Sequence, residues 1–264
     1  MRFTVITPTY NRVHTLNRVY ESLVQQTFTD FEWLVIDDGS SDGTDALVSR
    51  FKESASFPIR YEWKPNGGKH TAMNLGVKLA AGEFVLFLDS DDRCTANALE
   101  RFDHHWKLIP NPEKFSTLPS LCKTPDGKLV GNPYEADVVD ACTLADQLRV
   151  RGAAERWGIN RTDVLREFLF PEGERFVPEA LVWNRIARKY AARFVNEALR
   201  IYYYEPTGDT LSAKTVGIRA CSPKATLAYY RELYQSPVPP RLRIRAALNW
   251  LRFRTHKLAG TRLP

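Results

Sequence analysis

Short apolar runs alternate with helical patterns along roughly the first hundred residues of the chain. Strand-like runs are expected at 3–7, 32–36, 59–63 and 84–88. After each run, apolar residues recur at the spacing of an amphipathic helix, as they do between Leu16 and Leu23. Strands that alternate with helices of this length pair in parallel through right-handed crossovers. The pattern therefore predicts an α/β fold with a Rossmann-like, doubly wound, mostly parallel sheet and helices on both faces.

The fourth run joins a wholly apolar strand to a cluster of acids. Phe84 to Leu88 are consecutive large apolar residues, which is typical of a strand buried on both faces. The run leads directly into Asp89-Ser90-Asp91-Asp92. Carboxylates this close repel one another, so they face solvent, cap the next helix, which is expected near 95–105, or hold a cation. A helix cap accounts for one carboxylate and leaves the others unexplained.

Polar loops follow three of the predicted strands, at 8–12, 37–38 and 89–92. Because ligands of open α/β sheets bind outside the carboxyl ends of the strands, these loops are expected to share one site. The first loop has neither the glycine-rich turn of a dinucleotide fold nor the lysine of a P-loop. The carboxylates at this edge instead indicate a divalent ion that bridges the protein and a diphosphate.

Charge is distributed unevenly along the 264 residues, and it sets one segment apart. The formal net charge is +6, and residues 241–264 contain no acid. The basic residues of this segment are Arg241, Arg243, Arg245, Arg252, Arg254, Lys257 and Arg262. Leucine, isoleucine and aromatic residues lie between them, as in a basic interfacial helix that attaches to an anionic membrane. The alternative is that the apolar stripe of this helix packs on the rest of the protein.

Four motifs occur in the order and at the loops that this fold would bring together. They are Thr7-Pro8-Thr9-Tyr10-Asn11-Arg12, Asp37-Asp38-Gly39-Ser40, Asn66-Gly67-Gly68 with Ala72-Met73-Asn74-Leu75-Gly76, and Asp89-Ser90-Asp91-Asp92. Together they resemble the family 2 glycosyltransferases of GT-A fold, closely so over about residues 1–110. The resemblance implies an inverting enzyme that moves a sugar from a nucleoside-diphosphate donor, expected to be a UDP-sugar, to a hydroxyl of a surface polysaccharide or glycolipid. It also implies a divalent metal cofactor, Mn²⁺ or Mg²⁺.

The resemblance assigns separate roles to the three aspartates. Asp91 is expected to be the principal metal ligand. Asp89 is expected to contact the donor ribose or the metal shell. For Asp92 it leaves two roles open, positioning the acceptor in catalysis or capping the helix that follows.

The same resemblance gives roles in donor binding to residues of the other loops. Asp38 would accept a hydrogen bond from a pyrimidine N–H, Tyr10 would stack on that base, and Pro8 would shape its slot. Arg12 and Lys69 are expected to contact the diphosphate. The remaining expected donor-binding residues are Thr9, Asn66 and Ser90.

A general base is needed because an acceptor hydroxyl is a poor nucleophile until its proton is removed. Pro178 suits the first position of a helix, so Glu179 falls in the first turn, where the helix dipole stabilises a carboxylate. Capping electrostatics alone would explain Glu179, whereas the resemblance implies an acidic base at the start of such a helix. Family members more commonly have a Glu-Asp pair at this point, but here Ala180 follows Glu179. Either Glu179 or Glu174 is therefore the expected base.

The expected organisation is a nucleotide-sugar-binding half (1–110), an acceptor-binding and catalytic-base half of the same domain (111–215) and a basic helical extension (216–264). Segment 207–212 resembles the flexible segment that family members place over the donor. No leader or membrane-spanning pattern is recognisable, so we expect a cytoplasmic protein, peripheral on the inner membrane face through 241–262. The alternatives are a catalytically silent nucleotide-sugar-binding or carbohydrate-binding protein and a sugar nucleotidyltransferase. Nucleic acid is not expected as a partner, because the rest of the chain is nearly neutral and contains no RNA-binding motif.

Overall fold

The computed structural model describes residues 1–152, 154–204 and 215–259. Segment 207–212, expected to cover the donor, lies outside them. In the first half of the chain, the elements are β1 (Phe3–Thr9), α1 (Leu16–Val24), β2 (Phe31–Asp37), α2 (Thr44–Ser54), β3 (Ile59–Trp63), α3 (Lys69–Leu79), β4 (Phe84–Phe87), β5 (Arg93–Cys94), α4 (Ala98–Lys107), the 3₁₀ helix η1 (Pro112–Lys114) and β6 (Phe115–Lys123). In the second half they are β7 (Val138–Ala141), α5 (Leu144–Arg151), β8 (Trp157–Arg161), α6 (Thr162–Glu167), α7 (Glu179–Ala187), β9 (Ala191–Val195), β10 (Ala198–Ile201), α8 (Thr215–Cys221), α9 (Pro223–Gln235) and α10 (Pro240–Ala259).

The described residues form one sheet of ten strands, in the order β3-β2-β1-β4-β8-β6-β10-β5, with β9 beside β6 and β7 beside β9. The strands β3, β2, β1 and β4 are parallel neighbours, as the alternating pattern predicted. β8 then lies antiparallel between β4 and β6. The carboxyl ends of β1, β2 and β4 therefore lie at one edge of the sheet, where the predicted polar loops begin.

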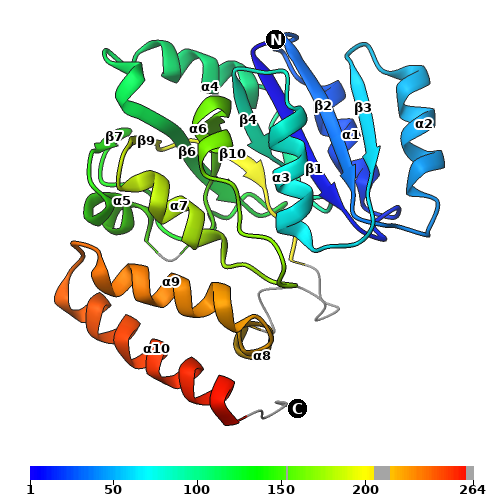
Figure 1. Ribbon diagram of the computed structural model, residues 1–264. Coiled ribbons are helices and arrows are strands. Elements are labelled where there is room, and N and C mark those ends of the chain that lie inside the picture. Colours follow the sequence, from blue (N-terminus) through cyan, green and yellow to red (C-terminus); the bar gives the residue numbers. More distant parts are fainter. Residues whose placement is uncertain (153, 205–214, 260–264) are drawn as a thin grey trace.

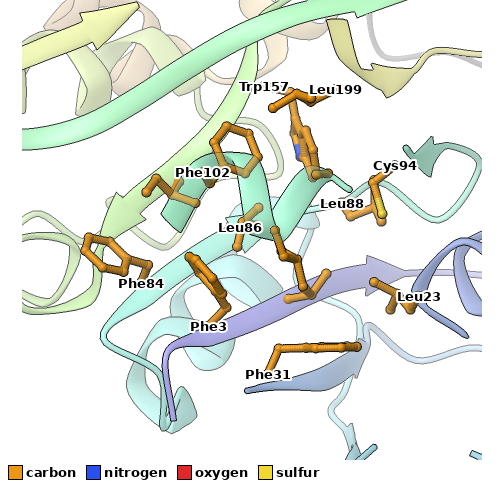
Figure 2. Packing of buried hydrophobic residues seen from close by; sticks show 14 of the residues in the cluster. Phe3, Leu23, Phe31, Phe84, Leu86, Leu88, Cys94, Phe102, Trp157 and Leu199 are labelled. Atoms are coloured by element: carbon orange, nitrogen blue, oxygen red, sulfur yellow. The ribbon is translucent and has the colours of Figure 1, made fainter. Parts of the chain in front are cut away.

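Alternate residues of the central strands supply two hydrophobic cores, one on each face of the sheet. Phe3, Phe84 and Leu86 face the side that is covered by α1, α2 and α4, and Figure 2 shows them packed together. Val85 faces the other side, which is covered by α3, α6 and α7. Figure 1 shows helices on both faces. The α/β fold and its two-sided covering are thus as predicted from the sequence.

Helices α9 and α10 form an antiparallel pair below the sheet, in orange and red in Figure 1. Ala246 and Phe253 of α10 are buried, and the Phe253 ring stacks on Tyr230 of α9. The apolar stripe predicted from the sequence is formed by Ile244, Ala247, Leu248 and Leu251, and three of these residues, Ile244, Leu248 and Leu251, are 61%, 63% and 53% exposed. The alternative that this stripe packs on the rest of the protein is therefore wrong, because α10 packs on α9 through another face. Among the described residues, no helix has the length and apolar character needed to cross a membrane.

Candidate active site

A cavity of about 1390 Å³ opens at the carboxyl ends of β1, β2 and β4. It is lined by residues from both halves of the chain. Apart from the alternative base Glu174, the residues that the sequence predicted for metal binding, donor binding or catalysis are among them, namely Pro8, Thr9, Tyr10, Arg12, Asp38, Asn66, Lys69, Asp89, Ser90, Asp91, Asp92 and Glu179. The sequence motifs therefore meet at one site.

The loop after β2 is held to the loop before α3 through Asp38. Its Oδ1 accepts hydrogen bonds from Lys64 Nζ and, at 2.9 Å, from the Gly67 amide, and its Oδ2 accepts one from the Gly68 amide at 2.8 Å. Asn66 Nδ2 donates to the Asp38 carbonyl oxygen at 2.8 Å. Gly68 has a φ of 96°, a conformation that favours glycine. Among the described residues, Asp38 Oδ2 accepts one hydrogen bond, so it can accept a second one from a ligand.

The loop after β1 forms another part of the cavity wall. Tyr10 is 50% exposed, so its ring is accessible to a ligand. Thr9 Oγ1 is buried without a hydrogen-bond partner among the residues that the structure describes. Arg12 is partly buried and lies close enough to Asp91 to act on that carboxyl electrostatically. This loop thus offers an aromatic face and a cation on the same wall.

Asp92 is enclosed in the protein, with an exposed fraction of 1%. Arg200 Nε on β10 donates to its Oδ2 at 2.7 Å, and the Tyr203 amide donates to its Oδ1 at 2.9 Å. The expectation that Asp92 caps the following helix is wrong, because Asn97 occupies the N-cap position of α4. Its other expected role, in positioning the acceptor, stays a prediction.

Asp89 lies between two cations. Lys69 Nζ is 2.8 Å from its Oδ1, and Arg200 Nη2 donates to its Oδ2 at 2.8 Å. Burial alone would raise the pKa of Asp89, but Lys69 and Arg200 outweigh it and hold the pKa well below its usual range. Asp89 is therefore ionised at neutral pH and fixed in orientation.

Lys69 also contacts the first residue of α7. Its Nζ is 3.2 Å from Glu179 Oε1, so one ammonium group bridges Asp89 and Glu179. Burial opposes the charge of Lys69, but both carboxylates raise its pKa. Pro178 is the N-cap of α7, and the Glu179 side chain is 45% exposed. Glu179 is thus accessible at the same point of the cavity as the acidic loop.

Glu174, the alternative base, has a different environment. Its carboxylate accepts hydrogen bonds from the Lys224 and Ala225 amides at 2.9 and 2.7 Å, at the start of α9. These are backbone donors that have no partner within the helix. Glu174 does not line the cavity, and its contacts are those of a helix cap.

Several charged residues of the cavity were not predicted from the sequence, among them Arg200 and Glu155. Arg200 was detectable in principle, because it interrupts the apolar run of Leu199 and Ile201. Glu155 had no such signal, since it lies in an irregular polar stretch. Burial raises the pKa of Glu155, Arg200 opposes the shift, and Glu179 adds to it. Glu155 thus adds a second carboxylate close to Glu179.

Of the three adjacent aspartates, Asp91 alone has no ion pair with a described residue. Burial and the nearby charge of Asp89 raise its pKa. The described chain contains no group of three or more His, Cys, Asp or Glu side chains that could hold a metal ion. Mg²⁺ typically binds one or two carboxylates together with substrate phosphates. The residues therefore fit a metal ion that binds along with a diphosphate.

Two solved structures share this fold over nearly the whole chain. Residues 1–349 of Staphylococcus aureus TarS in complex with UDP-GlcNAc match with a TM-score of 0.74 and 23% identity, over 99% of this chain and 74% of that one. The mannosyltransferase PcManGT from Pyrobaculum calidifontis, in complex with GDP-Man and Mn²⁺, matches with a TM-score of 0.63 and 17% identity, over 98% and 74%. The GT-A fold is confirmed by these likenesses.

Residues 4–108 match the family model described as glycosyl transferase family 2. Over this segment the chain is similar to family 2 glycosyltransferases. It is 31% identical over 205 residues to an uncharacterized glycosyltransferase of Rickettsia felis, covering 75% of this chain and 32% of that protein. It is 41% identical over 96 residues to the UDP-Glc:alpha-D-GlcNAc-diphosphoundecaprenol beta-1,3-glucosyltransferase WfgD of Escherichia coli, covering 36% of this chain and 37% of WfgD. The chain thus spans about a third of the length of these relatives.

Proposed function

We propose that this family 2 glycosyltransferase moves a sugar from a UDP-sugar to a hydroxyl group of a glycan or glycolipid, with a divalent metal and with inversion of the anomeric carbon. One observation carries the proposal. Lys69 bridges Asp89, at the end of the strand that leads into the acidic loop, and Glu179, at the start of α7. A donor and an acceptor hydroxyl can therefore meet beside the same lysine.

The nucleotide would lie against the loops after β1 and β2. The Tyr10 ring is accessible for stacking on a base, and the open acceptor position on Asp38 Oδ2 suits a pyrimidine N–H. Names of similar proteins support the choice of a uridine nucleotide, because WfgD is named for UDP-Glc and a TarS structure contains UDP-GlcNAc.

Asp91 is the residue that we propose to hold the metal, because no lysine or arginine among the described residues forms an ion pair with it. When bound, a divalent ion neutralises charge on the diphosphate as it leaves. Arg12 and Lys69 would add positive charge at the same group. Asp92 would act through Arg200, which it orients toward Asp89.

We assign the general base to Glu179 rather than to Glu174. Glu179 is accessible in the cavity, whereas Glu174 is engaged with two backbone amides of α9. The Glu179 carboxylate would accept the proton of the acceptor hydroxyl as its oxygen attacks the anomeric carbon. Direct attack with departure of the diphosphate from the opposite side inverts that carbon.

The exposed face of α10 supports a membrane-associated acceptor. Ile244, Leu248 and Leu251 are more than half exposed, and basic side chains surround them. Neither α10 nor the residues after it contain an acid. Such a surface suits the headgroup region of an anionic membrane, where we propose that this glycosyltransferase meets a glycolipid on the inner face.

A donor screen tests the proposal. The full chain, with Mn²⁺, is incubated with a panel of UDP-sugars and GDP-sugars, and the released nucleotide is measured. We expect slow UDP release from one UDP-sugar and faster release when an acceptor is added. Binding without release would indicate a carbohydrate-binding protein. Conversion of a labelled nucleotide-sugar and pyrophosphate into a nucleoside triphosphate and a sugar 1-phosphate would indicate a nucleotidyltransferase, and either result would contradict the proposal.

A further inference from the structure

Two arginines line the cavity away from the donor loops and lack the carboxylate partner that most partly buried arginines of this chain have. Arg193, for example, is paired with Asp140, and Arg185 with Glu232. Arg151, the last residue of α5, donates no hydrogen bond and forms no ion pair with any described residue. The carbonyl groups at the C-terminus of α5 stabilise the positive charge of Arg151, but they do not accept hydrogen bonds from its guanidinium group.

Arg219 of α8 is held by aromatic rings instead of by an acid. Its Nη1 donates to the Tyr230 hydroxyl at 2.8 Å, and its guanidinium lies 5.5 Å from the centre of the Tyr229 ring. Stacking and a neutral hydroxyl fix the planar group without neutralising it. Most of its N–H donors stay available on the side of the cavity.

Both arginines lie beside the same pair of rings, because Tyr229 and Tyr230 contact Arg219 and pack in one hydrophobic cluster with Leu148 of α5, three residues before Arg151. Burial raises the pKa of Tyr229, and Arg219 and Arg151 both oppose that shift, as does Arg245 of α10. Tyr229 lies on α9, which packs against α10. The positive charge at this end of the cavity therefore extends toward the exposed basic face of α10.

Glu155 connects this end of the cavity to the proposed base. It acts electrostatically on Arg151 and also on Glu179. Arg151, Arg219 and Glu179 line the same cavity, and α5 contacts α7, so one molecule can contact the arginines and place a hydroxyl at Glu179. Two guanidinium groups with unused N–H donors on one cavity wall favour a phosphate, which accepts paired N–H donors from arginine.

We propose that Arg151 and Arg219 form a subsite for a phosphate or diphosphate ester on the acceptor. The inference rests on the proposed function, since it identifies these residues as the acceptor side of a sugar-transfer site. It restricts the acceptor to phosphate-bearing molecules, either a phosphorylated glycan or a lipid-linked sugar. Neutral glycans would bind at least about tenfold more weakly, given the usual energy of a charge-assisted hydrogen bond.

The test compares two small probes that differ in the phosphate. A hexose 1-phosphate and the corresponding methyl hexoside are titrated into the full chain by calorimetry, with UDP and Mn²⁺ saturating so that the donor site is filled. We expect the phosphate to bind and the methyl hexoside to bind about tenfold to a hundredfold more weakly. Arg151→Gln and Arg219→Gln should each remove most of this difference. The control is Arg149→Gln, which changes an exposed arginine of the same helix that pairs with Glu135.

UDP affinity is measured for each variant and reports the fold and the donor site separately. Unchanged UDP affinity with loss of the phosphate preference supports the subsite. Equal binding of the two probes, or a preference that persists in the double variant R151Q/R219Q, would overturn it. Failure of the wild-type chain to bind UDP would instead contradict the proposed function.

Sedimentation with lipid vesicles distinguishes binding of an acceptor phosphate from binding of a membrane headgroup. The same variants are sedimented with phosphatidylglycerol vesicles. We expect R151Q/R219Q to sediment like the wild-type chain, because both arginines line the cavity and not the exposed face of α10. Loss of sedimentation with the phosphate preference intact would assign the arginines to lipid headgroups and overturn the proposal.

Discussion

The three adjacent aspartates after β4 have three different environments. Asp92 is buried against Arg200, Asp89 is shared between Arg200 and Lys69, and Asp91 has no ion pair with a described residue. A carboxylate that already pairs with a lysine or arginine is a poor ligand for a metal ion, because the side-chain cation already compensates its negative charge. The structure therefore distinguishes one carboxylate among three that look equivalent in the sequence.

Replacement of Glu179 tests the general base. Glu179→Gln should lower the rate of sugar transfer on the order of 10² to 10⁴-fold, because the amide cannot accept the hydroxyl proton. UDP affinity should stay within about twofold, since Lys69 keeps Asp89 as a partner. Both quantities are measured on the same preparation, by nucleotide release and by calorimetry.

Glu174→Gln is the matched control for this prediction. It should leave the transfer rate nearly unchanged and lower the free energy of unfolding by about 1 kcal/mol, because Glu174 caps α9. Denaturant unfolding measures that change. An inactive Glu174→Gln together with an active Glu179→Gln would show that the base has been misassigned.

Single residues of the site were predictable where a motif lies at the end of a strand. The sequence placed Asp38 and Asp91 correctly at the cavity, because the end of a parallel strand is fixed by local patterning. It could not reveal which residues Arg200 pairs with, because Asp89 and Asp92 lie over a hundred positions away in the sequence. Pairings of this kind depend on how the sheet closes, and one sequence does not encode them locally.

Helix α10 shows a similar limit at the level of an element. The sequence predicted a basic helix with a stripe of Ile244, Ala247, Leu248 and Leu251 and left open whether this stripe faces a membrane or the protein; a helix is present at Pro240–Ala259. The buried face is the one with Ala246 and Phe253. Both faces are apolar, so periodicity alone cannot tell which one packs on α9 and which one is exposed.

The exposed face of α10 should bind anionic membranes. The full chain is expected to sediment with phosphatidylglycerol vesicles at low salt and to be released at high salt, since each basic residue near the surface contributes about 1 kcal/mol that salt screens. Ile244→Ser with Leu248→Ser should weaken sedimentation, because it removes apolar area but no charge. Leu108→Ser, at an exposed position next to α4, is the control.

Sedimentation that does not respond to salt would contradict this prediction. So would a double variant that sediments as well as the wild-type chain. Either result would leave the basic face of α10 without a membrane role, while the assignment of the cavity residues would be unaffected.

The whole molecule divides into a half that local patterns predicted and a half that they did not. The alternation of strands and helices gave β1 to β4 and their helices, because parallel units are built from neighbouring segments. In the second half, β8 inserts between β4 and β6, and β10 pairs with β6 and β5. These strands pair with segments that are distant in the sequence, so local hydrophobic patterns did not predict the pairings.

The central claim is that the two halves form one metal-dependent donor site around Asp91. Calorimetric titration of UDP into the full chain tests it most directly, with Mn²⁺, with a chelator, and with Asp91→Asn. We predict that UDP affinity rises at least about tenfold with Mn²⁺ and that Asp91→Asn removes this increase, because an amide is a weaker ligand for a hard cation than a carboxylate. Equal UDP affinity in Mn²⁺ and in chelator, or an undiminished Mn²⁺ effect in Asp91→Asn, would contradict the claim.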